Sequence, residues 1–77
     1  MNISKLHNLA EVLLANPNTA KGCAGFMDLF YSETAAIGRN LMQGRIDAEV
    51  HAQQWMREAI RTYQRLGWLA EYWGVAI

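Results

Sequence analysis

The stretch that decides the fold is DAEVHAQQWMREAIRTYQRL, residues 47–66. Its apolar residues recur at spacings of 4, 3, 1, 3, 1, 3 and 3, which places them on one side of a helix with 3.6 residues per turn; they are Ala48, Ala52, Trp55, Met56, Ala59, Ile60, Tyr63 and Leu66. Acidic residues stand at its beginning, basic residues near its end, and Gly67 follows as a stop signal. The pattern predicts a helix over 47–66 whose apolar side, with Trp55, Ile60 and Tyr63, is core.

A second helix is expected just upstream, over 26–43, with Gly44 as its left-handed stop. Its apolar residues form two adjacent stripes, which predicts a helix covered from two directions: Phe26, Leu29, Phe30, Ile37 and Leu41 in one, and Met27, Tyr31, Ala35 and Met42 in the other. The connection to the next helix is short, so the two helices should be antiparallel neighbours. Gly22 and Gly25 each cost roughly 1 kcal/mol inside a helix, so residues 19–25 are expected to form a loop or a loose first turn.

The two ends of the chain predict shorter elements. Residues 4–15 carry leucines and a valine at helical spacing, with Ser4 as the expected N-cap and Pro17 ending the segment. After Gly67, aromatic and aliphatic residues four apart indicate a last short helix or a packed tail. No β-hairpin signal is present. The expected fold is all-α: one domain over 1–77, a small bundle of three main helices (about 4–15, 26–43 and 47–66) plus a short C-terminal helix or packed tail.

Composition narrows the class of protein. The chain has 77 residues, of which 52% are hydrophobic, and with one cysteine it forms no internal disulfide, so part of its apolar surface is expected in an interface and a homodimer is the expected state. Seven basic and seven acidic residues give zero net charge, which removes the whole-domain electrostatic argument for nucleic acid. No run approaches the ~18 apolar residues of a membrane span, and no signal peptide is recognisable, so a cytoplasmic location is expected.

Two features are candidate partner-binding residues. Arg57, Arg61 and Arg65 follow one another at intervals of four on the polar side of the 47–66 helix, where they would contact phosphates or an acidic protein surface. The plainer alternative is a solvated face, with Glu58 pairing with Arg61 and the later arginines interacting with the helix dipole. The second feature is an aromatic cluster, a residue type common at binding hot spots, which contains Trp68, Tyr72 and Trp73. Its plainer alternative is packing that closes the bundle.

No catalytic, cofactor-binding or metal-ligating motif is present. His7, His51 and Cys23 are far apart in the sequence, and neither Cys-x-x-Cys nor His-x-x-x-His spacing occurs. A domain this small has little room for a substrate pocket. We therefore expect neither an enzyme nor a cofactor.

The leading hypothesis from the sequence is a small non-enzymatic protein–protein interaction module. It would act by stoichiometric binding, as an adaptor or inhibitor of the kind found in phages and mobile elements, and its partner would be a protein. The first alternative is a nucleic-acid-binding transcriptional regulator that uses the arginine-rich face of the 47–66 helix. The second alternative is a structural subunit of a larger assembly.

Overall fold

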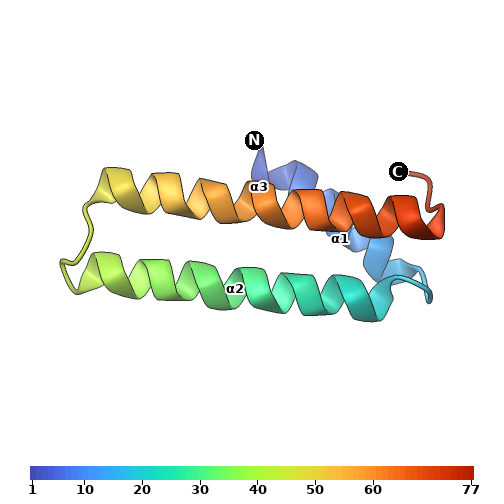
Figure 1. The fold of residues 1–77 in the computed structure, drawn as a ribbon, viewed down its shortest axis with the longest axis horizontal. Coiled ribbons are helices and arrows are strands. Elements are labelled where there is room, and N and C mark those ends of the chain that lie inside the picture. Colours follow the sequence, from blue (N-terminus) through green and yellow to red (C-terminus); the bar gives the residue numbers. More distant parts are fainter.

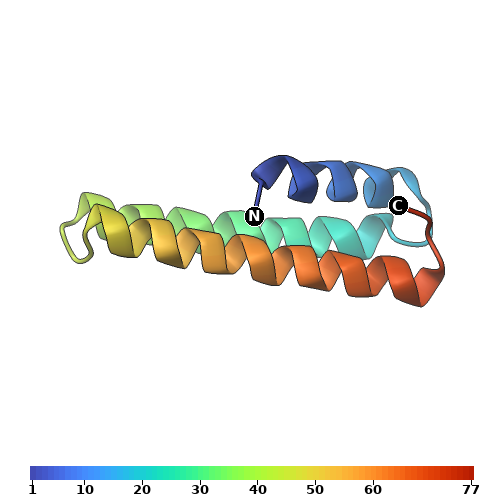
Figure 2. The same cartoon turned by 90° about the horizontal axis from the view of Figure 1, so that it is seen from above.

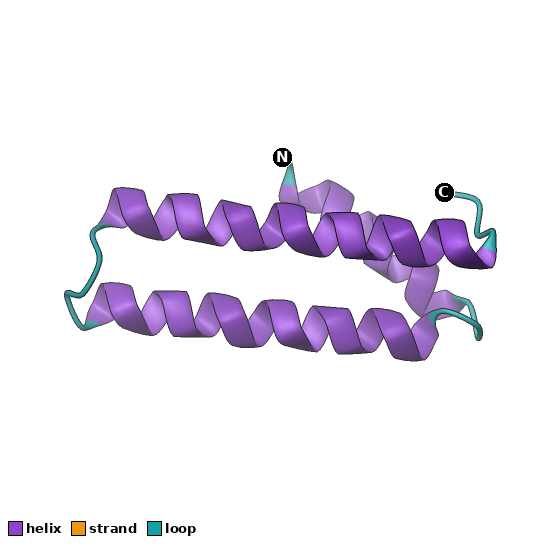
Figure 3. Cartoon of the chain, viewed as in Figure 1, coloured by secondary structure: helices purple, strands orange, loops and turns teal.

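The computed structural model describes all 77 residues and contains three helices: α1 (Ile3–Ala15), α2 (Ala20–Met42) and α3 (Ala48–Trp73). No strand is present, as Figure 3 shows, so the predicted all-α bundle is confirmed. The predicted antiparallel pairing is also confirmed, because α2 and α3 form one long hairpin (Figure 1). α1 is shorter and packs along only the half of this hairpin that lies next to the α1–α2 turn (Figure 2). The molecule is elongated, with extents of 43 × 20 × 16 Å.

At the connection between α2 and α3, one helix stops and the next begins where the local sequence predicts. Gly44 adopts a left-handed conformation with φ of 72°, which a residue with a Cβ atom adopts only under strain. Asp47 caps α3, since its side chain accepts a hydrogen bond of 2.8 Å from the backbone N–H of Val50. At the start of α1 the predicted cap is wrong by two positions: Asn2, not Ser4, is the N-cap, and its side chain accepts from the Ser4 N–H.

The loop expected over 19–25 is wrong, because α2 already begins at Ala20. Tertiary contacts offset the cost of two helical glycines. The side chain of Leu69 lies 3.3 Å from the place that a Cβ atom on Gly22 would occupy, so glycine lets α3 approach α2 closely. Cys23 is fully buried, and Thr19 is buried beside the turn, where its hydroxyl donates a 2.7 Å hydrogen bond to the carbonyl of Leu13.

The stop expected at Gly67 is also wrong. α3 continues through Gly67 to Trp73, so residues after Gly67 form the last two turns of one long helix instead of a separate short helix. The reason is burial: Leu69 and Ala70 are buried in the core only if the helix continues, and full burial of a leucine is worth about 1.5–3 kcal/mol, more than a helical glycine costs. The left-handed stop lies at Gly74, with φ of 65°.

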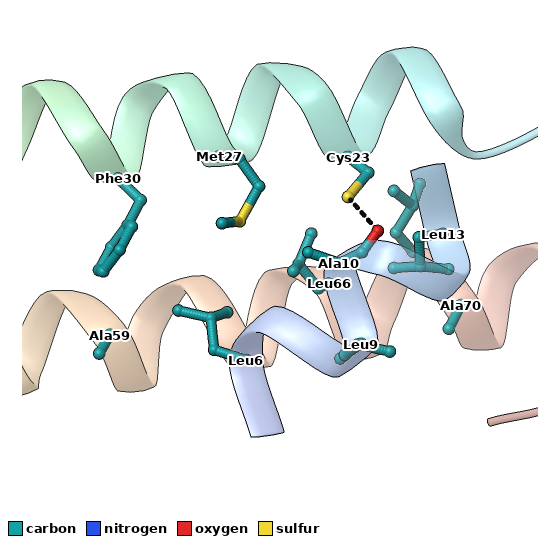
Figure 4. Close-up of a cluster of buried hydrophobic side chains, with 11 residues drawn as sticks. Leu6, Leu9, Ala10, Leu13, Cys23, Met27, Phe30, Ala59, Leu66 and Ala70 are labelled. Carbon is teal, nitrogen blue, oxygen red and sulfur yellow. Dashed lines mark hydrogen bonds between the residues drawn. The ribbon is translucent and has the colours of Figure 1, made fainter. Parts of the chain in front are cut away.

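The core is the region where all three helices meet, and Figure 4 shows most of its buried side chains. Eleven residues form it: Leu6, Leu9, Ala10, Leu13, Cys23, Met27, Phe30, Ala59, Leu66, Leu69 and Ala70. Trp55 and Tyr63 are half-buried and pack against this core, as predicted. Ile60 was predicted to be core as well, and this is wrong, since 40% of its surface is exposed. It lies beyond the side of α3 that faces α1 and α2.

The other half of the hairpin has no third helix. Ile37 is buried there, because α2 and α3 pack on each other along their whole length (Figure 1). The expectation that α2 is covered from two directions holds at Met27, which is buried beside α1 and α3. It fails further along, because Tyr31 and Met42 are 51% and 87% exposed.

Candidate interaction surface on α3

The continuation of α3 through Gly67 brings the two predicted site features onto a single rigid element. Sequence patterning placed the arginines on a helix and the aromatic residues on a separate segment, whereas both belong to α3. At 100° per residue, five side chains fall within about 80° of the helix circumference, on the side turned away from the core. These side chains, here called the α3 outer face, are Arg57, Arg61, Arg65, Trp68 and Tyr72.

The aromatic part of the α3 outer face is exposed and ordered by its own contacts. Trp68 and Tyr72 are 60% and 69% exposed, one helical turn apart, and their rings stack with centroids 5.7 Å apart and planes inclined by 30°. Trp73 stands about 140° around the helix from Trp68 and lies outside this face. It meets Tyr72 edge-on, with centroids 5.5 Å apart at 77°. The plainer alternative, in which these rings close the bundle, is therefore wrong for Trp68 and Tyr72.

The tail after α3 takes that closing role instead. The backbone N–H of Val75 donates a 2.9 Å hydrogen bond to the carbonyl of Ala70, and the Val75 side chain packs against the core. Ile77 lies in a hollow beside Leu9 and Val12 of α1. The tail thus folds back over α1, which leaves Trp68 and Tyr72 uncovered on the opposite side.

The cationic part of the α3 outer face is only partly neutralised. Arg61 forms an ion pair of 3.1 Å with Glu58, as the plainer alternative predicted, and this is the molecule's one salt bridge. Arg57 and Arg65 have no such partner. The dipole explanation for the later arginines is wrong, because α3 extends two turns beyond Arg65 and carries no basic residue in its last turn. Most of the positive charge on this face is therefore free to meet an acidic group.

A shallow hollow of about 690 Å³ runs along the flank of α3 next to the arginines. Its lining combines charged and apolar groups, with Arg57 and Arg61 on one side and Met56 and Ile60 on the other. All lining residues come from the same helix, so the hollow is an open depression on a convex surface. Its shape suits a side chain of a docked macromolecule better than an enclosed small molecule.

The remaining chemically active side chains lie apart from this face and from one another. Cys23 is buried between helices, where its Sγ donates to the carbonyl of Ala10 at 3.5 Å (Figure 4) and burial raises the pKa of the thiol. His7 is exposed on α1 and His51 is half-buried on α3. No group of three His, Cys, Asp or Glu side chains is placed to hold a metal ion. None of the three helices combines the length and the apolar character needed to cross a bilayer.

Comparison of the chain with known protein families, with curated proteins and with solved structures gives no match.

Proposed function

We propose that this chain is a small interaction module, an adaptor or inhibitor that acts by stoichiometric binding to another protein, as a homodimer in the cytoplasm. The observation that carries the proposal is the stacked Trp68–Tyr72 pair, exposed on a rigid helix beside a row of arginines. Trp, Tyr and Arg are the residue types most enriched at binding hot spots. Because the helix already holds the two rings in one arrangement, docking costs little further side-chain entropy.

The partner surface that fits is apolar at its centre and acidic around it. The two stacked rings offer a flat apolar area. Arg65 and Arg57 lie about one and three turns before Trp68 on the same face, and neither has an ion-pair partner. Carboxylates on the partner would pair with these guanidinium groups and set the direction in which α3 docks.

The experiment that tests this proposal is affinity capture from the native host with three forms of the chain. The wild type is compared with a Trp68→Ala, Tyr72→Ala double variant and with a Leu14→Ala control, which removes an exposed apolar side chain of α1 from a hollow lined only by α1 and α2 residues. We expect a partner that the wild type and the control retain at fixed stoichiometry in native mass spectrometry, and that the double variant loses. Capture of the same partner by the double variant at unchanged affinity would refute the proposed surface.

A second candidate function is favoured by one specific observation. Exposed aromatic rings next to arginines are also the means by which many proteins bind single-stranded nucleic acid, through base stacking and phosphate contacts. The zero net charge of the chain weighs against it. A salt-dependent mobility shift of nucleic acid that is lost in an Arg57→Ala, Arg61→Ala variant would support a nucleic-acid-binding regulator, and absence of a shift at low salt would remove it.

A further inference from the structure

The half of the α2–α3 hairpin without α1 has a side that no third helix covers, and the strip of surface along it is here called the open groove. Tyr31 marks this side of α2, because it lines a hollow together with Ala10 and Leu14 of α1. Residues four, seven and eleven positions further along lie on the same side of the helix, beyond the end of α1. These are Ala35, Gly38 and Met42.

The α3 wall of the open groove follows in the same way. Met56 lies against Met1 just ahead of α1, with the Met1 nitrogen 3.8 Å from the Met56 sulfur. One and two turns earlier on α3, on the same side, come Ala52 and Ala48, both exposed. The groove therefore continues the surface on which α1 lies, and Figure 2 shows α1 ending about halfway along the hairpin.

The open groove has the composition of an interface core. None of its seven residues is charged, and several are small enough to let another backbone approach: Tyr31, Ala35, Gly38, Met42, Ala48, Ala52 and Met56. The molecule as a whole exposes 5158 Å², whereas a monomeric protein of 8.7 kDa is expected to expose about 4,700 Å². An apolar face left open on a chain with surplus exposed area indicates a docking surface.

We propose that the open groove binds the open groove of a second copy of this chain. The two copies are related by a two-fold axis that lies between them and is perpendicular to the long axis of the hairpin. With that axis, α2 lies antiparallel to α2 and α3 lies antiparallel to α3, which gives a central four-helix segment in which every helix is antiparallel to its neighbours. The α2–α3 turn of each copy then arrives where α1 of the other copy begins. A specific interface of this kind has to bury about 1,000 Å² in total.

Charge complementarity favours a second copy as the occupant. α1 carries no acidic residue in its first turn, so the positive pole of its dipole is uncompensated, and Lys5 adds a further positive charge there. The hairpin end that would approach this pole carries two acidic residues, Asp47 and Glu49, and two basic ones, Arg39 and Arg45. Asp47 already caps α3, so Glu49, which has no ion-pair partner, is the carboxylate that would pair with Lys5. Each copy thus presents Glu49 near the place where its partner has Lys5 and the positive end of α1.

This inference rests on the homodimer in the proposed function and uses none of the five side chains of the α3 outer face, although Ala52 and Met56 line both the open groove and the hollow beside the arginines. That face points away from the core and remains exposed on each copy of the dimer. Loss of dimerisation and loss of partner capture are therefore separate results, each from its own variant.

Two glycines of α2 provide a matched test. Gly38 lies in the open groove and Gly25 lies on the side of α2 away from α1 and α3, and at neither position would a Cβ atom meet any atom within 4 Å. Glu at either position is accommodated by the single chain and favours the helix equally. In the proposed dimer only Gly38→Glu places an unpaired carboxylate in the interface.

The measurement is sedimentation velocity of the full chain at micromolar to about 0.1 mM concentration, with circular dichroism to verify helicity. We expect the wild type and Gly25→Glu to sediment as dimers and Gly38→Glu as a monomer of unchanged helicity. A monomeric wild type throughout the range, or a Gly38→Glu chain that dimerises as well as Gly25→Glu, overturns the proposal. If another protein fills the groove instead, the purified wild-type chain sediments as a monomer, which also overturns the proposal.

A charge reversal tests the arrangement of the two copies. Glu49→Lys is expected to weaken dimerisation about tenfold at low salt, and Glu49→Lys combined with Lys5→Glu is expected to recover most of that loss. The same dissociation constant for all three forms contradicts the antiparallel arrangement.

Discussion

Two buried threonines show how differently one residue type contributes to this fold. The hydroxyl of Thr19 donates a 2.7 Å hydrogen bond to the carbonyl of Leu13 and so joins the end of α1 to the start of α2. The hydroxyl of Thr62, on the buried side of α3, has no hydrogen-bond partner. Burial of a polar group without a partner costs free energy, whereas a bonded hydroxyl contributes about 0.5–1.5 kcal/mol.

The same substitution should therefore have opposite effects at the two positions. Thr62→Val keeps the side-chain shape and removes the unpaired hydroxyl, so it should raise the free energy of unfolding by about 1 kcal/mol. Thr19→Val leaves the Leu13 carbonyl without its partner and should lower that free energy by about 1–2 kcal/mol. Urea unfolding followed by circular dichroism measures both. A Thr62→Val chain less stable than the wild type would show that this hydroxyl is satisfied.

Cys23 makes the fold sensitive to alkaline pH. Burial raises the pKa of its thiol above the ordinary value of 9.0, so the unfolded chain ionises at lower pH than the folded one. The stability is fully present below pH 9.0 and falls as the pH rises above that value towards the pKa of the folded state. In urea titrations at increasing pH, the wild type should lose stability relative to Cys23→Ala only in this alkaline range. A parallel decline of both chains throughout would contradict a buried thiol.

Among the elements, the two helix ends at the α2–α3 connection, which local chemistry determines, were predicted from the sequence, and the ends that packing determines were not. The cap of α1 is also local, but it was predicted two residues late, at Ser4 instead of Asn2. Asp47 caps a helix through its own side chain, and Gly44 ends one through its own backbone, so both signals are complete within a few residues. Gly22 and Gly67 are ambiguous without the fold. Gly22 is helical because Leu69 approaches it from α3, and the helix passes through Gly67 because the residues beyond it are buried.

Substitutions of Gly67 and Gly74 test where α3 ends. Gly67 is helical and a Cβ atom there meets nothing within 4 Å, so Gly67→Ala should stabilise the protein by about 0.5–1 kcal/mol. Gly74 has φ of 65°, so Gly74→Ala should destabilise it by about 1 kcal/mol. Thermal unfolding of the two variants compares them directly. The reverse order would mean that the helix stops at Gly67, as the sequence alone indicated.

The candidate site shows the same division between local and packing signals. The arginine row and the aromatic residues were identified from spacing within the chain, but their position on a common face depends on the continuation of α3. The open groove was not identified, because the stripe containing Tyr31 and Met42 has the same sequence pattern as a covered face. Only the length of α1 relative to the hairpin distinguishes the two. The sole sequence signal was that α1 is shorter than the helices beside it.

As a whole molecule, the chain is a long hairpin with a third helix over half of it and two surfaces on different sides. The open groove faces the side where α1 lies, and the α3 outer face is turned away from the core. A radius of gyration of 13.7 Å exceeds the about 11.5 Å expected of a compact domain of this length, which reflects the half that α1 leaves uncovered. In the proposed dimer, self-association through the open groove would lengthen the particle and leave the α3 outer face of each copy exposed.

Small-angle X-ray scattering of the purified wild-type chain tests this arrangement most directly. Two copies that overlap only along their open grooves should give a particle of twice the chain's mass and about one and a half times its 43 Å length. A particle with the mass and the length of a single chain, or a dimer no longer than one chain, would contradict the proposed dimer.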